Sequence, residues 1–119
     1  MNLKSLRAHC LRKPGVTESY PFGPGALVMK VGAKVFAIIG EDEEPLQASF
    51  KCEPEIADVL RNTHAAVRPG YHLNKRHWNT VTLDGTVEDS DVFDWMDDSY
   101  DLVLAGLPRR ARDEIVGEQ

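Results

Sequence analysis

The chain has 119 residues, a formal net charge of −5, 42% hydrophobic residues and 28% charged residues. This length allows one domain with its own hydrophobic core, and the composition is close to that of globular proteins. The sequence contains no apolar run of the roughly 18 residues that a membrane span needs. Its charged N-terminal segment is also unlike a signal peptide. We therefore expect a single cytoplasmic domain, residues 1–119, that has no membrane partner.

Basic and acidic residues are separated along the chain. All charged residues between positions 59 and 83 are basic, namely Arg61, Arg68, Lys75 and Arg76. The acids concentrate in GEDEEP (40–45) and between positions 84 and 101, where no base occurs. We expect a bipolar molecule, in which a local basic face attracts phosphate although the total charge is negative.

The first predicted element is an amphipathic helix that begins after Asn2, a candidate N-cap, and ends at Pro14-Gly15. Its apolar face consists of Leu3, Leu6, Cys10 and Leu11. The following segment VTESYPFGPG (16–25) is rich in Pro and Gly, so we predict an ordered but irregular loop. Cys10 and the distant Cys52 form no CxxC motif, which favours two reduced and mostly buried thiols.

Two strands are predicted at ALVMKV (26–31) and KVFAII (34–39), joined by Gly32-Ala33. A two-residue loop with Gly first is typical of a type II′ hairpin. In that register one face of the hairpin carries Leu27, Met29, Val31, Phe36 and Ile38. The opposite face carries Ala26, Val28, Lys30, Val35, Ala37 and Ile39.

The rest of the chain alternates between strand and helix signals. QASFKC (47–52) predicts a half-buried strand, and EPEIADVLRNTH (53–64) predicts a helix with Pro54 in its first turn. AVRPGYHL (66–73) is expected to be extended, and WNTVTL (78–83) is the clearest strand of this half. NKRH (74–77) fits either a loop or one helical turn. A long helix at 90–106 and a short one at 108–115 follow.

The predicted order is therefore α-β-β-β-α-β-β-α, with a last helical piece. Strands grouped next to hairpin signals indicate an antiparallel sheet, and the βαβ alternation of nucleotide-binding folds is absent from the sequence. We predict the α+β class: a two-layer fold with an antiparallel five-stranded sheet and helices on one side.

The sequence shows no motif for catalysis or for a cofactor. Neither a dinucleotide-binding G-x-G-x-x-G nor a P-loop occurs, and no serine or cysteine lies in an activating motif. His64, His72 and His77 lack the ligand spacing of a zinc site. The helical acids Asp94, Asp97, Asp98 and Asp101 are typical of a solvated face. We expect no catalytic residue, metal or cofactor, and an enzymatic role is left open but not favoured.

The segment PGYHLNKRHWNTVTLDG (69–85) combines cations with aromatic side chains, and two interpretations apply. Its candidate nucleic-acid or anion-binding residues are Arg68, His72, Lys75, Arg76, His77, Trp78 and Asn79. In the second interpretation, which residue types alone favour, Trp78 is a core residue and the cations cover the acidic helix at 89–101. Strand alternation would send Trp78, Thr80 and Thr82 to one face, and His77, Asn79, Val81 and Leu83 to the other.

The chain resembles the MmcQ/YjbR family of small bacterial proteins over nearly its whole length. The motifs that carry the resemblance are Tyr20-Pro21-Phe22-Gly23, VMKVGAKVFA, Lys51-Cys52 with Pro54, RPGYHLNKRHWNTVTLDG, and SYDLV followed by LPRR. The resemblance implies an antiparallel five-stranded sheet with helices on one side, similar to type III secretion chaperones. It also implies DNA binding through a double-wing motif.

The resemblance makes DNA the expected partner of the basic and aromatic segment. Arg68, Lys75 and Arg76 would then contact phosphates, while His72, His77, Trp78 and Asn79 would supply stacking or base contacts. Two alternatives are kept: a protein-interaction module, chaperone-like or homodimeric, and a binder of a small anionic ligand that uses the same cations.

Overall fold

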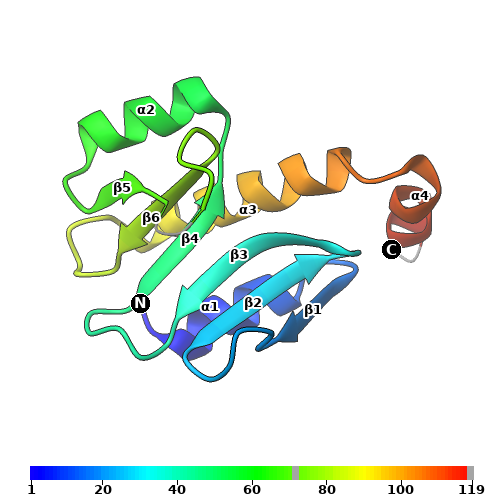
Figure 1. Cartoon of the computed structure of the whole chain (residues 1–119), viewed down its shortest axis with the longest axis horizontal. Coiled ribbons are helices and arrows are strands. Elements are labelled where there is room, and N and C mark those ends of the chain that lie inside the picture. The colour runs from blue at the N-terminus through cyan, green and yellow to red at the C-terminus, as the bar shows by residue number, and fades with distance from the viewer. Residues whose placement is uncertain (71–72, 118–119) are drawn as a thin grey trace.

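The computed structural model describes residues 1–70 and 73–117, and these residues form four helices and one antiparallel sheet of six strands. The helices are α1 (Leu3–Leu11), α2 (Pro54–Thr63), α3 (Asp89–Ala105) and α4 (Arg109–Gly117). The strands are β1 (Val16–Ser19), β2 (Ala26–Val31), β3 (Lys34–Gly40), β4 (Gln47–Lys51), β5 (Val67–Pro69) and β6 (Trp78–Thr82). Their order in the sheet is β1-β2-β3-β4-β6-β5, so β1 and β5 are the edges (Figure 1). The α+β prediction is confirmed.

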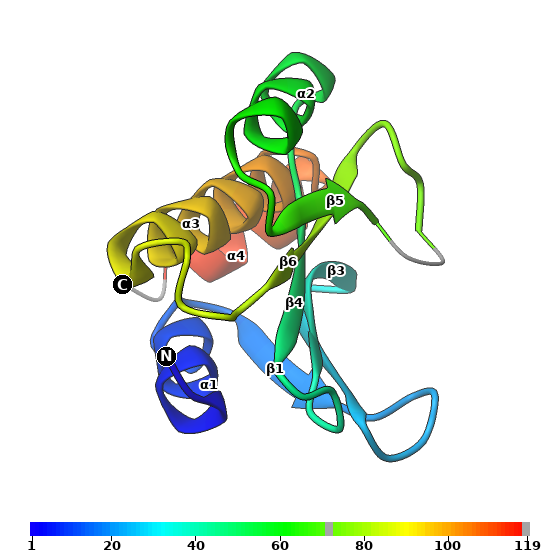
Figure 2. The same cartoon turned by 90° about the vertical axis from the view of Figure 1, so that its left-hand side faces the viewer.

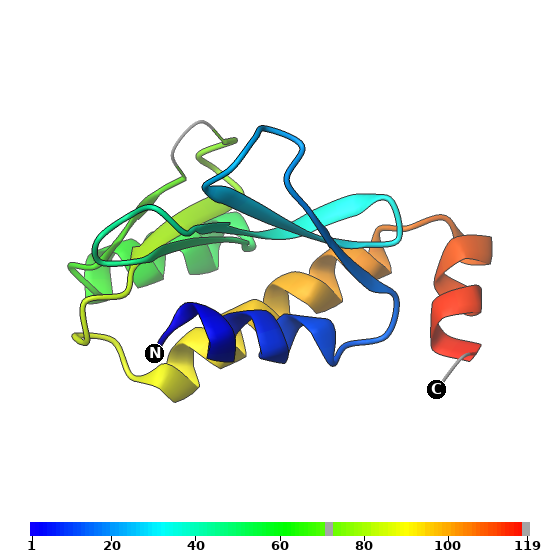
Figure 3. The ribbon, with the colours of Figure 1, turned by 90° about the horizontal axis from the view of Figure 1, so that it is seen from below.

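The helices lie on one side of the sheet. α1 and α3 run side by side beneath it (Figure 3), and α2 packs against β5 and β6. The core lies between the sheet and these helices, and its fully buried side chains include Leu6, Met29, Phe36, Ile39 and Met96. In the described part of the chain, the opposite side carries connections and no helix, and among these connections are loop 20–25 and turn 73–77 (Figure 2). We call this side the open face.

α1 forms as its sequence predicts. The Asn2 side chain accepts a hydrogen bond from the Ser5 N–H at 2.9 Å, and the Ser5 hydroxyl accepts one from the Asn2 N–H at 3.2 Å. This reciprocal pair is a capping box that satisfies donors at the start of the helix. Leu6 and Cys10 are buried, whereas Leu11 is exposed at the end of the helix.

The hairpin of β2 and β3 has the predicted two-residue loop, but a bulge changes its faces. Met29 lies opposite Ala37 and Lys30 opposite Val35, so Phe36 is an extra residue in β3. Phe36 and Ala37 are both fully buried. Beyond the bulge the alternation is inverted: Ile39 is in the core, and Ile38 belongs to the open face. The predicted faces of residues 37–39 were therefore wrong.

Ser99 on α3 bonds to β3 and to β4 next to the end of their pairing. The last paired residues of these strands are Ala37 and Phe50. The Ser99 hydroxyl donates to the Phe36 carbonyl at 2.6 Å and accepts from the Lys51 N–H at 2.8 Å. A fully buried side chain thus satisfies two backbone groups beside the bulge.

Val16–Ser19 forms a strand where the sequence predicted a loop. β1 pairs with β2, placing Val16 opposite Val31 and Ser19 opposite Val28. The Pro and Gly residues that suggested a loop begin only at Pro21, so the four residues before them are free to pair with β2. This strand accounts for the difference between five predicted strands and six. Within the described residues, no helix is long and apolar enough to cross a membrane.

Candidate functional site

The open face contains an apolar groove of about 470 Å³ between loop 20–25 and turn 73–77. Its lining residues come from four strands and both connections, and they are Phe22, Ala26, Val35, Ile38, Ser49, Leu73 and Trp78. Phe22 is 77% exposed although it is a large aromatic residue. The groove therefore presents aromatic and aliphatic surface to solvent, on the side of the sheet that the helices leave uncovered (Figure 2).

Three basic residues belong to β5 and to the turn that precedes Trp78. Arg68 in β5 pairs with Thr80, and its guanidinium donates to Thr82 Oγ1 at 2.8 Å and to Gln47 Oε1 at 2.7 Å, which holds it flat on the open face. Lys75 is exposed and its Nζ donates to the Gly70 carbonyl at 3.2 Å. Arg76 is exposed on the same turn. Among the described residues, no carboxylate forms an ion pair with any of the three.

Residues 74–77 form a turn that places Trp78. The N–H groups of His77 and Trp78 both donate to the Asn74 carbonyl, at 3.2 and 2.9 Å. Arg61 of α2 holds this turn from the helix side, because its guanidinium donates to the carbonyls of Lys75 and Trp78. From the sequence, this segment fitted either a loop or one helical turn. The two hydrogen bonds to the Asn74 carbonyl show that it forms one turn.

Two further predicted site residues, Asn79 and His77, do not lie on the open face. Asn79 is 3% exposed, and its amide accepts from Arg61 Nε at 2.6 Å and donates to the Ala57 carbonyl at 3.3 Å. His77 lies toward Cys52 and Leu102, on the helix side of the strand. His72 lies outside the described residues. The structure thus brings Arg68, Lys75, Arg76 and Trp78 together and separates Asn79 and His77 from them.

The ion pairs of the acidic helix come from another direction than the second interpretation assumed. His9 Nε2 and Lys13 Nζ of α1 each lie 2.7 Å from Asp97 Oδ1, and the N-terminal amine lies 3.6 Å from Asp89. The ion pairs described for α3 therefore go to the N-terminal segment and not to Arg68, Lys75 or Arg76.

Sequence reasoning missed the apolar part of the groove. Phe22 was assigned to a loop without a role. Ile38 was grouped on one face with Leu27, Met29 and Phe36, because alternation alone does not reveal the bulge at Phe36. The signal at Phe22 was an aromatic residue in a short Pro- and Gly-rich connection, where burial is difficult. Within residues 1–70 and 73–117, no three His, Cys, Asp or Glu side chains are grouped to hold a metal ion.

Comparisons with known proteins agree on one family. A family model described as YjbR matches residues 11–102. The Escherichia coli (strain K12) protein YjbR is 39% identical over 116 residues, which cover 98% of each chain. YbdF of Escherichia coli O157:H7 is 32% identical and covers 84% of this chain and 82% of its own.

Solved structures match the fold as well. The crystal structure of a Deinococcus radiodurans protein with a DUF419 domain superposes with a TM-score of 0.91 at 38% identity, covering 96% of this chain and 87% of that one. A Pseudomonas syringae crystal structure has a TM-score of 0.75 at 24% identity, covering 87% and 99%. The second likeness concerns the fold alone.

Proposed function

The chain belongs to the YjbR family, and from that premise we propose that it is a DNA-binding domain that holds single-stranded DNA on its open face. The observation that carries the proposal is the apolar groove with Phe22 and Trp78, together with Arg68, Lys75 and Arg76 of β5 and of the turn before Trp78, which have no carboxylate partner among the described residues. Bases stack on aromatic side chains with little sequence preference, and cations beside them contact the phosphates.

Single-stranded DNA suits this surface better than a duplex. A duplex keeps its bases stacked inside, whereas an exposed Phe22 and a groove lined by Trp78 and Ile38 offer surface to unstacked bases. The acids Glu41 to Glu44 follow β3, and Tyr20 donates a hydrogen bond to Glu41, which places negative charge beside loop 20–25. We therefore place the phosphates at Arg68, Lys75 and Arg76. Both cysteines are free, which supports a reducing cytoplasmic location for this activity.

The proposal is tested by fluorescence anisotropy of a labelled single-stranded oligonucleotide and its duplex at two salt concentrations. Three phosphate contacts predict that log affinity falls with log salt with a slope of about −2 for a single strand. Lys75→Ala/Arg76→Ala should weaken binding and flatten that slope. Phe22→Ala should weaken binding by about 1–3 kcal/mol with the slope unchanged, because stacking involves no counterion release.

Lys4→Ala/Arg12→Ala is the matched control, since it removes the same charge from exposed positions of the N-terminal segment on the helix side. This control should bind DNA nearly as the wild type does. Equal weakening by both double variants would contradict a site on the open face, because it would indicate only a response to net charge. Absence of binding to either DNA form at low salt would contradict the function itself.

A small anionic ligand is the second candidate, favoured by the size of the groove. A volume of about 470 Å³ lies within the range of small-molecule pockets. A nucleoside monophosphate would place its base against Trp78 and its phosphate at the same cations. A rise in the melting temperature with such a nucleotide, without oligonucleotide binding at low salt, would replace DNA by this ligand class.

A further inference from the structure

Helix α2 leaves apolar side chains exposed on the helix side of the sheet, far from the open face. Ile56 is 52% exposed and Val59 is 59% exposed, and Ala57 is the buried residue of this helix. α2 packs against β5 and β6, and α3 passes behind β4 in the view of Figure 1. Ile56 and Val59 are one helical turn apart, so together they expose a small apolar surface to water. Another surface that covered them would remove this apolar area from solvent.

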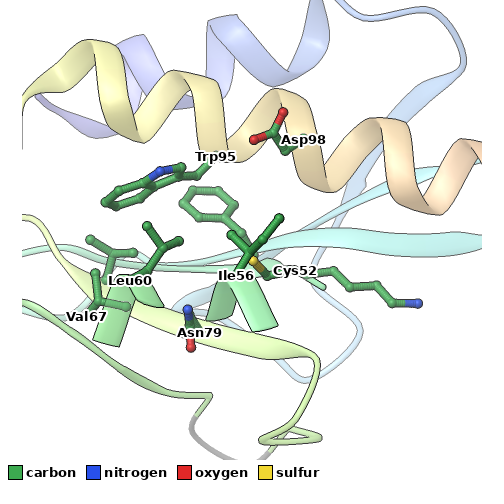
Figure 4. A pocket seen from close by; sticks show the side chains of 10 residues that line it. Cys52, Ile56, Leu60, Val67, Asn79, Trp95 and Asp98 are labelled. Atoms are coloured by element: carbon green, nitrogen blue, oxygen red, sulfur yellow. The ribbon is translucent and has the colours of Figure 1, made fainter. Parts of the chain in front are cut away.

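A groove of about 390 Å³ lies between α2 and α3, next to these side chains. Its floor is apolar and consists of Cys52, Ile56, Leu102 and Ala105. Figure 4 shows the adjoining interior, where Trp95 of α3 faces Leu60 and Val67, with Ile56 and Cys52 beside them. The cavity enclosed there is about 30 Å³, which is room for about one water molecule. Of these two spaces, the enclosed cavity is too small for a ligand, and the outer groove between α2 and α3 has room for one.

Three carboxylates border the groove: Glu53, Asp98 and Asp101. None of them takes part in an ion pair among the described residues. Partial burial, followed by repulsion from Asp101, Asp94 and Asp97, raises the pKa of Asp98. Both causes disfavour the ionised form of Asp98, and a cation placed next to it would favour that form.

The groove residues of α3 follow a helical repeat. Asp98, Asp101, Leu102 and Ala105 are spaced i, i+3, i+4 and i+7, and they form a stripe that extends about 10 Å along the helix. A stripe of this kind is complementary to two turns of another helix lying alongside, with apolar contacts in the centre and charged contacts at the margin.

We propose that the groove between α2 and α3 binds a basic amphipathic helix of a partner protein. Apolar side chains of that helix contact Ile56, Leu102 and Ala105, while its Arg or Lys residues contact Glu53, Asp98 and Asp101. The charge of the groove excludes nucleic acid and acidic helices. This site is separate from the open face, so neither proposal depends on the other.

The test uses a labelled synthetic 14-residue peptide with Leu at i, i+3, i+4 and i+7 spacing and Arg at the flanking positions, followed by fluorescence anisotropy. A scrambled peptide of the same composition keeps the charge but loses the apolar face. We expect the amphipathic peptide to bind at least about tenfold more tightly than the scrambled one, because only it buries its leucines in the groove.

Protein variants locate the site. Asp98→Asn/Asp101→Asn and Ile56→Gln should each weaken binding of the amphipathic peptide by about tenfold. Glu43→Gln/Glu44→Gln is the matched control, because it removes the same charge from the exposed loop between β3 and β4, and it should have no effect. Circular dichroism spectra identical to the wild type's would show that each variant is folded.

Three outcomes would overturn the proposal. Equal affinity for the scrambled peptide, or equal weakening by the control pair, would show a response to net charge without a docking groove. A concentration-dependent dimer in sedimentation that Asp98→Asn/Asp101→Asn abolishes would assign the groove to a second copy of this chain. Lys75→Ala/Arg76→Ala should leave peptide binding unchanged, so failure of the DNA proposal is distinguishable from failure of this one.

Discussion

At the scale of single residues, Arg61 joins α2 to the segment that presents the groove. Its side chain is only 19% exposed, and it donates to Asn79 Oδ1 at 2.6 Å and to the carbonyls of Lys75 and Trp78. The sequence counted Arg61 among the unopposed cations of the basic segment. Its position among backbone carbonyls gives it a structural role, because those acceptors occupy the guanidinium that a phosphate would need.

We expect Arg61→Ala to lower the free energy of unfolding by about 1.5–3 kcal/mol, since charged hydrogen bonds are lost and buried Asn79 loses its donor. Arg61→Lys should recover only part of this loss, because one ammonium cannot replace the planar fork. Urea denaturation measures both. Exposed Arg12→Ala is the control, and a loss at Arg61 no larger than at Arg12 would contradict the assigned role.

At the scale of elements, α3 completes the sheet where β3 bulges. Ser99 satisfies one carbonyl of β3 and one N–H of β4, so its substitution should act on both strands at once. Ser99→Ala should destabilise the protein by about 1–3 kcal/mol, because two buried backbone groups lose their partner. Ser90→Ala, at an exposed position of the same helix, is the control.

Hydrogen exchange followed by NMR distinguishes this role from simple packing. The Lys51 amide should lose protection in Ser99→Ala by more than the amides of β1, which lie at the far edge of the sheet. Uniform loss of protection across all strands would contradict a local role at the bulge and indicate a general loss of stability.

The elements themselves were largely predictable from sequence, and the exceptions have physical causes. The capping residue Asn2 and the turn at Gly32-Ala33 are local signals, so α1 and the two strands and two-residue loop of the central hairpin were predicted correctly. β1 and the bulge depend on partners distant in sequence: Val16 needs the edge of β2, and the extra Phe36 is accommodated by Ser99 from α3. Alternation assumes a regular strand, which is why it failed after residue 36.

The candidate site was predicted only in part, for the same reason. The sequence pointed to Arg68, Lys75, Arg76 and Trp78 because cations and an aromatic residue occur close together in one segment. In the fold, Trp78 lines the groove, and the three cations belong to β5 and to the turn before Trp78. Asn79 is a residue type that often contacts bases, but it lies on the face of β6 that points toward α2. No local pattern showed that Phe22, about fifty residues earlier in the chain, borders the same groove.

At the scale of the whole molecule, ion pairs join the N-terminal segment to α3 in addition to the contacts of the core. Asp97 is partly buried, which opposes its ionisation, but hydrogen bonds from Lys13 and His9 and their Coulomb attraction outweigh this and lower its pKa. Asp98, the next residue, has a raised pKa, caused by burial and by neighbouring carboxylates. Adjacent aspartates of one helix therefore contribute to stability with opposite signs.

We expect Asp97→Asn to destabilise the protein at neutral pH by up to about 1 kcal/mol, a small value because the side chain is 39% exposed. A lowered pKa stabilises above the unfolded value of 3.8, so this difference should vanish as pH falls through the folded pKa. Asp98→Asn should instead stabilise at neutral pH, and this gain should fade as acid protonates Asp98 in the wild type. Urea denaturation between pH 3 and 8 measures both variants, and effects of the same sign at neutral pH would contradict the assignment.

The edges of the sheet bear on how the protein behaves when it is concentrated. β1 has four residues and β5 has three, and β5 ends in Pro69, which lacks an amide hydrogen. Glu18 of β1 is also paired with Arg7 of α1, which fixes charge beside that edge. Neither edge offers a long row of free backbone groups on which another chain could add strands. Short edges of this kind disfavour pairing between the sheets of two molecules, so contacts between copies are expected at the grooves and not at the edges.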